Sequence, residues 1–562
     1  MPKGEYLLHY YLTGETDYKN LPAEKRCRFQ LPDPGYPYQS SDYAFRVQGG
    51  GTSMGAISSA VTCSVFYKYL RWLDPVDAHN MAAVLYAGLS IFVLYWFSLE
   101  AFGRRTAVLA SLFLAFFPAL VGYSHVLIKD LPVFCFVSLT IWSFWKGVTR
   151  NRYKWIWLSM IFLGMGLVAK MNAAYAVIIL ACWLPIPLRQ RAGIFARVTG
   201  KFWRTLFFYP VTVILTFMFF SPRIWYEHPY NLVNNIGRTI TVMTGIYTYV
   251  ANKNQKISPY EQKRIKSAGK LKKKKFNMGQ FLRKIFYAPL YALISIPLTV
   301  LLLAFCGLWF LITGKGAHAA GDGWLVVCWA FVPLVFCMLP FIFIHSGIRE
   351  FFPFIQGVCL LAGLGGDYLY RLIKEKYEIT PEKGLAVYLG VLALSVGPEI
   401  ISVMQYHPYE SAFVNSLVGG LKGAQTLRLP FSGRVGIPQV GDSRGGSFRN
   451  SLKWLDKHGK APSIVIIWAT SSKFIAMTRD IKIILDDWDN SYKEKRKLRK
   501  IDFDTVYIVF NHYYWNLVHP LYGYCYKNLT PIYTASANGA PVNYVYRMSR
   551  KDFFKLILPR DA

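Results

Sequence analysis

The chain has 562 residues, of which 53% are hydrophobic and 17% aromatic, and the hydrophobic residues are gathered in long runs. This pattern excludes an ordinary water-soluble protein and predicts a polytopic α-helical membrane protein. The formal net charge of +33 would also fit a nucleic-acid-binding protein. Because much of the basic charge lies in loops between apolar runs, the membrane surface explains it better, and we expect membrane lipids but no nucleic acid as partners.

Residues 1–78 are polar and aromatic, with Pro and Gly punctuation, and we interpret them as an N-terminal loop region without a signal peptide or a span. A transmembrane core is expected over 79–404, with a long loop at 222–286. The fourth and fifth of its ten candidate spans are short and could form one re-entrant pair. The ten lie at about 79–101, 106–123, 131–148, 155–169, 172–188, 203–221, 286–313, 323–344, 351–370 and 384–404.

The basic residues of the short loops are unevenly divided between the two sides of the membrane. Alternate loops on one side collect 16 Lys and Arg residues, against only Lys129, Lys170 and Arg349 on the other side. Cytoplasmic loops carry such an excess, so we expect the side with three to be extracytoplasmic. The long loop at 222–286 falls on that same side despite its many lysines, because long loops translocate largely regardless of charge. Its basic segment is either a solvated stretch or attracts anionic lipid headgroups or a phosphate-bearing donor.

The last part of the chain, 405–562, has no candidate span. Strand-like runs occur at Ser463–Trp468, Thr505–Phe510 and Asn543–Tyr546, and a helix is expected over Phe448–Lys457. We interpret this region as a small soluble α/β domain on the extracytoplasmic side.

The connection between the second and third spans is the first candidate site. Ser124–Pro132 lies between two apolar runs and includes Lys129 and Asp130. Ionisable residues are costly at the mouth of a tight connection between spans, so by default they are interpreted as functional. The alternative is that this pair only marks where the chain meets water.

Several of these segments resemble a known family. The run His79–Trp145, with Phe102-Gly103-Arg104-Arg105 and the Lys-Asp-Leu-Pro at 129–132, is similar to bacterial relatives of the protein O-mannosyltransferases. These are GT-C-fold glycosyltransferases that use a polyprenyl-phosphate sugar. Gly166–Lys170, His345–Pro353 and His407–Ala424 extend the resemblance over most of residues 79–460.

The resemblance implies a membrane glycosyltransferase of the bacterial plasma membrane. It would transfer a sugar from a polyprenyl-phosphate donor to an acceptor at the extracytoplasmic face. Two rivals remain: a transporter, which would show ionisable or broken-helix features near mid-membrane, and a catalytically inactive partner that keeps the donor-binding face.

One departure from the family concerns the catalytic base. The family's first outer loop opens with acidic residues, the expected base, and the chain begins inside what looks like that loop without the usual Asp-Glu. Either the true start lies upstream, or Glu5, Glu15 or Asp17 substitutes, or the protein is inactive.

Transfer from a lipid-linked phosphate sugar needs a carboxylate to take the acceptor's proton and cations to hold the departing phosphate. The resemblance implies that Asp130 orients or deprotonates the acceptor. Lys170 and Arg349 are expected to bind the phosphate, and His345 is a candidate for a further hydrogen bond or proton. A divalent cation is possible, although no cluster of carboxylates argues for one. The sequence does not identify the sugar or the acceptor.

Overall fold

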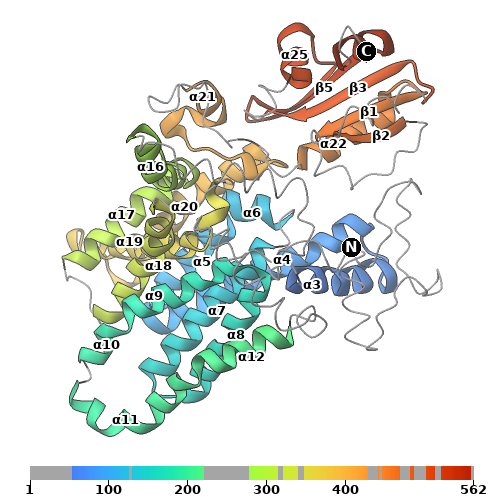
Figure 1. Cartoon of the computed structure of the whole chain (residues 1–562). Helices are drawn as coiled ribbons and strands as arrows, with labels where there is room; N and C mark the ends of the chain where they lie inside the picture. Colours follow the sequence, from blue (N-terminus) through green and yellow to red (C-terminus); the bar gives the residue numbers. More distant parts are fainter. Residues whose placement is uncertain are drawn as a thin grey trace.

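Helices dominate the computed structural model. It describes residues 53–125, 129–190, 192–220, 278–313, 320–339, 347–427, 441, 446–468, 481–486, 501–512 and 520–557. Figure 1 shows these helices gathered in one body, with a smaller sheet domain, orange to red, at one end of it.

Among the described residues, six helices are long and apolar enough to cross a membrane, and the number rises to eight if two bent pairs each count as one span. The expected polytopic helical membrane protein is thus confirmed, but with fewer straight spans than the ten expected. The spanning segments lie in α4 (Pro75–Phe102), α7 (Asp130–Thr149), η3 with α9 and α10 (Met171–Ala174, Tyr175–Trp183, Pro185–Gln190), α11 with α12 (Ala192–Phe207, Tyr209–Phe219), α18 (Ala320–Met338) and α20 (Pro381–Tyr406). The fourth candidate span is α8 (Tyr153–Ala169), an apolar helix too short for this count.

The second candidate span is bent. It consists of α5 (Arg104–Ala115) and α6 (Pro118–Ser124), whose axes differ by 55°. Pro118 begins α6, and a proline lacks the N–H that would continue the preceding helix and restricts the residue before it.

The candidate span at 286–313 is sharply bent. This region holds α16 (Met278–Ser295) and α17 (Leu298–Ile312), and the axes differ by 113° at a break that contains Pro297. The carbonyls left open at the corner are satisfied by Asn415, whose Nδ2 donates to the oxygens of Leu293 and Ile296 at 2.6 and 2.8 Å. A distant side chain thus stabilises a bend that local apolarity does not reveal.

The N-terminal region also differs from the expected loop. Within its described part, α3 (Ser53–Cys63) and the π-helical turn η2 (Ser64–Tyr69) form a helical stretch against α4. The hydroxyls of Ser58 and Tyr86 form a hydrogen bond of 2.7 Å across this contact. The stretch is rich in Ser, Ala and Gly, so its hydropathy is modest while its small residues let helices approach closely.

The helix α19 (Phe354–Lys376) lies at the centre of the body, and its first 14 residues, Phe354–Asp367, are all buried. Glycines permit this crowding. A Cβ at Gly365 would overlap the carbonyl oxygen of Leu303 on α17, and one at Gly357 would overlap the backbone of Ala330 on α18. The expected span at 351–370 is therefore an interior helix surrounded by other helices, and not a lipid-facing one.

Two ion-pair groups tie helix ends together at the end of the body opposite the sheet domain. Asp367 on α19 pairs with Arg105 of α5 at 2.5 Å and with Arg371 at 2.6 Å. Glu100 at the end of α4 pairs with Lys146 of α7 at 2.6 Å. Among the described residues, Arg105, Lys146 and Arg371, which belong to the basic short loops, thus lie at this end of the body.

The C-terminal region is a small α/β domain, as expected. Its five strands are β1 (Ser463–Trp468), β2 (Ile481–Asp486), β3 (Thr505–Asn511), β4 (Tyr533–Ala537) and β5 (Ala540–Ser549). They form one sheet in the order β2-β1-β3-β5-β4, with β1 parallel to β2 and β3 and the other pairs antiparallel. Helix α22 (Gly446–His458) covers one face, and α25 (Pro520–Asn528) and α26 (Arg550–Ile557) cover the other. The strands β2 and β4 were not predicted.

The sheet domain rests on the helical body through several polar contacts. Arg449 of α22 pairs with Asp74 and Asp77, at the start of α4, at 2.7 and 2.6 Å. Asn450 donates to the hydroxyl of Tyr409 at 2.8 Å. The turn η5 (Glu410–Ala412) packs on α6, where a Cβ at Gly122 would overlap its backbone. The domain therefore lies at the same end of the body as α6 and the start of α7.

Candidate functional site

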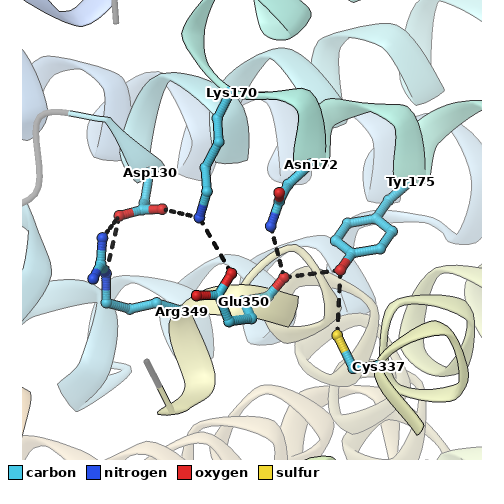
Figure 2. A network of polar contacts seen from close by, with 7 residues as sticks. All are labelled: Asp130, Lys170, Asn172, Tyr175, Cys337, Arg349 and Glu350. Carbon is cyan, nitrogen blue, oxygen red and sulfur yellow. Dashed lines mark hydrogen bonds and ion pairs between the residues drawn. The ribbon is translucent and has the colours of Figure 1, made fainter. Parts of the chain in front are cut away.

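The site forms around the carboxylate of Asp130, the first residue of α7. Its side chain is 3% exposed, and each of its oxygens accepts hydrogen bonds from a cation (Figure 2). Lys170 Nζ donates to Oδ1 at 3.0 Å, and Arg349 Nε and Nη2 donate to Oδ2 at 3.0 and 2.5 Å. Three residues that are far apart in the sequence thus meet in one buried ion-pair cluster.

The helix ends bring these three residues together. Lys170 follows the last residue of α8, in extended backbone, and precedes η3. Arg349 lies in the 3-10 turn η4 (Gly347–Phe351), which follows α18 and precedes α19. Each residue therefore lies where the chain turns between helices, at the end of the body that also carries the sheet domain.

Glu350 adds a second carboxylate, which was not predicted from the sequence as part of the site. Its Oε2 lies 3.5 Å from Lys170 Nζ. Burial alone lowers the pKa of Lys170, but the carboxylates of Asp130 and Glu350 outweigh it, so that the pKa is raised. The same balance of burial against Asp130 raises the pKa of Arg349. Both cations consequently stay charged at neutral pH despite their burial.

The backbone of the turn η4 is held as well. Asn172 Nδ2 and the Tyr175 hydroxyl both donate to the carbonyl oxygen of Glu350, each at 2.9 Å, and the Tyr175 oxygen lies 3.3 Å from the sulfur of Cys337 (Figure 2). The sequence gives no signal for these contacts, because Asn172 and Tyr175 are ordinary residues of an apolar run.

Lys170 and Arg349 retain N–H groups that can donate hydrogen bonds to an anionic ligand. An arginine has five N–H donors and a lysine three, and Asp130 uses only some of them. The side chains of Lys170 and Arg349 are 28% and 10% exposed, whereas that of Asp130 is 3% exposed. A ligand that approaches the cluster therefore meets the cations before the carboxylate. Phosphate oxygens suit such a site, since Arg binds them in bidentate fashion and Lys as a point charge.

A divalent cation does not fit the described part of the cluster. Within the described ranges, no group of three or more His, Cys, Asp or Glu residues could hold a metal ion. Both oxygens of Asp130 already accept from positively charged groups, which a metal would have to displace. Four other candidates from the sequence, Glu5, Glu15, Asp17 and His345, lie outside the described residues.

A further ionisable residue, also missed from the sequence, lies away from the cluster. Glu399 in α20 is fully buried, and neither of its carboxylate oxygens has a hydrogen-bond partner within the described residues. A single acid in an apolar run gives no hint from sequence of whether it faces lipid or protein.

Part of the helical body matches a known protein family. Residues 74–226 match the sequence pattern of the family described as dolichyl-phosphate-mannose-protein mannosyltransferase. This segment is related to the protein mannosyltransferases. It includes Asp130 and Lys170 and ends well before Arg349. The resemblance expected from the sequence is thus confirmed, whereas no curated protein sequence matches the chain.

Solved structures show a loose likeness over most of the chain. The apo structure of ArnT from Cupriavidus metallidurans superposes with a TM-score of 0.47 at 11% identity, covering 97% of this chain and 92% of that one. The same protein bound to undecaprenyl phosphate gives 0.43 at 12% identity, with 87% of each chain covered. The archaeal oligosaccharyltransferase AglB from Archaeoglobus fulgidus, in complex with an inhibitory peptide and a dolichol-phosphate, gives 0.38 at 12% identity, covering 82% of this chain and 61% of that one.

Proposed function

We propose that the chain is a membrane glycosyltransferase that transfers a sugar from a polyprenyl-phosphate donor to an acceptor. The observation that carries this proposal is the meeting of Lys170 and Arg349 around Asp130 at the ends of spanning helices. The family related to residues 74–226 is named for a dolichyl-phosphate-linked sugar, which has the same kind of head group. A phosphate bound at the ends of the spanning helices can stay attached to a lipid tail in the bilayer.

The two cations would act mainly on the leaving group. As the acceptor oxygen bonds to the anomeric carbon of the sugar, the bond from that carbon to the phosphate oxygen breaks, and the lipid phosphate gains a negative charge. The N–H groups of Lys170 and Arg349 are already positioned to donate hydrogen bonds to this charge. Such preorganised hydrogen-bond donors are effective because little reorganisation accompanies the reaction. The acceptor's proton passes to a carboxylate.

Asp130 is less suited to be that carboxylate than the sequence alone indicates. Two cations bind its two oxygens, and neighbouring positive charge makes a carboxylate a weaker base. We infer that Asp130 positions Lys170 and Arg349 and limits their net charge. Glu5 and Asp17 stay candidates for the base, and His345 for a further phosphate contact.

We further propose that the cluster and the sheet domain face the extracytoplasmic side of a bacterial plasma membrane, in keeping with the basic residues gathered at the other end. Single cysteines at two exposed positions test this in a cysteine-free background. Lys551→Cys in the sheet domain should react with a membrane-impermeant maleimide in intact cells. Lys376→Cys, at the end of α19, should react only after permeabilisation. The reverse pattern would contradict the orientation.

The reaction itself can be measured without knowing the acceptor, because glycosyltransferases of this kind can be followed through their common product, the lipid phosphate. Purified protein with a panel of polyprenyl-phosphate sugars and membrane extract should release lipid phosphate from at least one donor. Lys170→Gln should abolish the release, and the control Lys374→Gln, on the exposed end of α19, should not. Transport of intact donor across the membrane without release would favour a transporter.

A further inference from the structure

The turn that carries Arg349 is held through its backbone by two side chains. The carbonyl oxygen of Glu350 accepts from Asn172 Nδ2 and from the Tyr175 hydroxyl, each at 2.9 Å (Figure 2). A carbonyl oxygen has two lone pairs, so these two bonds occupy it fully. The peptide that follows Glu350, one residue beyond Arg349, is consequently fixed on its oxygen side.

Both donors come from the segment that also carries Lys170. Lys170 directly follows α8, Asn172 lies in η3, and Tyr175 begins α9. This one short segment supplies one cation of the cluster and holds the peptide next to the other cation. The distance between the ammonium group of Lys170 and the guanidinium group of Arg349 therefore depends on it.

Tyr175 is itself firmly placed. It is 4% exposed, its ring packs edge-on against Phe336 with centroids 5.4 Å apart, and its hydroxyl lies beside Cys337 Sγ. A buried hydroxyl that is held on both the ring and the oxygen can define a position for its partner. Arg349, in contrast, has a long side chain whose guanidinium group is held by Asp130.

We propose that Asn172 and Tyr175 are positioning residues for the phosphate site: by fixing the Glu350 carbonyl they aim Arg349 at the donor phosphate together with Lys170. This rests on the proposed function. The two residues touch no substrate and act through the turn η4. Precise placement matters because a charged hydrogen-bond donor that lies a fraction of an ångström out of place stabilises the transition state much less.

The test uses Tyr175→Phe, which keeps the ring, Asn172→Leu, which keeps the approximate volume, and the double variant. Each single variant should weaken the binding of a short-chain polyprenyl phosphate by about 2- to 10-fold, and the double variant by about 10- to 100-fold. The control is Tyr388→Phe, which removes a hydroxyl bond of the same kind, to the Arg105 carbonyl at 3.1 Å, near the opposite end of the body. It should leave binding unchanged.

A cycle with Arg349→Gln separates positioning from general stability. If Asn172 and Tyr175 act through Arg349, the double variant should cost no further affinity once Arg349 is already replaced. An equal further loss in that background would overturn the proposal, as would wild-type affinity in the double variant. If Arg349→Gln itself binds like the wild type, the proposed function fails instead, so the two failures are distinguishable.

Discussion

Replacing Asp130 by Asn is expected to destabilise the ligand-free protein by as much as about 3–5 kcal/mol, the usual cost of breaking a buried ion pair on one side. Lys170 and Arg349 would then face each other with their charges uncompensated, apart from Glu350 at 3.5 Å from Lys170. A lipid phosphate supplies the missing negative charge. Polyprenyl phosphate should therefore raise the melting temperature of Asp130→Asn by more than it raises that of the wild type.

The structure offers a matched control for this experiment. Asp367 is also buried between two cations, Arg105 and Arg371, but at the other end of the helical body. Asp367→Asn should lose stability for the same reason, and polyprenyl phosphate should not restore it. Rescue of both variants would indicate a general effect of the lipid on the protein.

The outcome also decides between two roles for Asp130. A general base contributes about 10²- to 10⁴-fold in rate, so in that role Asp130→Asn would cut turnover per folded molecule by about that factor, in addition to the loss of stability, and saturating donor would not restore it. A positioning role predicts the same loss of stability, but with much of the turnover per folded molecule kept once donor saturates the site. Measuring melting temperature and turnover on the same purified samples separates the two roles.

The placement of Asp130, Lys170 and Arg349 at the same end of the helical body could be anticipated from the sequence because it follows from simple alternation. Each of the three lies at a helix end, and successive spans reverse direction, so residues at every second connection reach the same side of the membrane. The contacts themselves could not be anticipated. Whether three residues on one side are neighbours depends on which helices pack together.

The features that the sequence did not reveal depend on long-range packing. The corner between α16 and α17 is stabilised by Asn415, more than a hundred residues away. The helix α3 is rich in small residues and has no strong apolar run, yet it packs against α4. In the same way, only the fold brings Tyr175 to the carbonyl of Glu350. Local periodicity carries no information about such partners.

The strands of the C-terminal domain also differ in whether the sequence reveals them. β1 was found because both faces of this strand are buried, with Ile464 and Ile466 on one side and Val465 and Ile467 on the other, which gives a continuous apolar run. β4, Tyr533–Ala537, lies at the edge of the sheet and is built from small and polar residues. It pairs with β5 without any apolar signal of its own.

Loss of a cation should weaken the binding of the donor lipid more than any other change to the cluster. Lys170→Gln and Arg349→Gln each remove a charge-assisted hydrogen bond, expected to cost about 1.5–3 kcal/mol, or roughly 10- to 150-fold in Kd. Arg349→Lys keeps the charge but loses the planar fork, so an intermediate loss is expected. Lys374→Gln, remote from the cluster, should bind as the wild type does.

The most direct measurement compares two ligands that differ only in the phosphate. Binding of a short-chain polyprenyl phosphate and of the corresponding polyprenol is measured on purified wild-type protein and on Arg349→Gln. If Lys170 and Arg349 form the phosphate site, the wild type binds the phosphate far more tightly than the alcohol, and Arg349→Gln loses most of that difference. Equal affinity of the wild type for the two lipids, or an unchanged preference in Arg349→Gln, would contradict a phosphate site at this cluster.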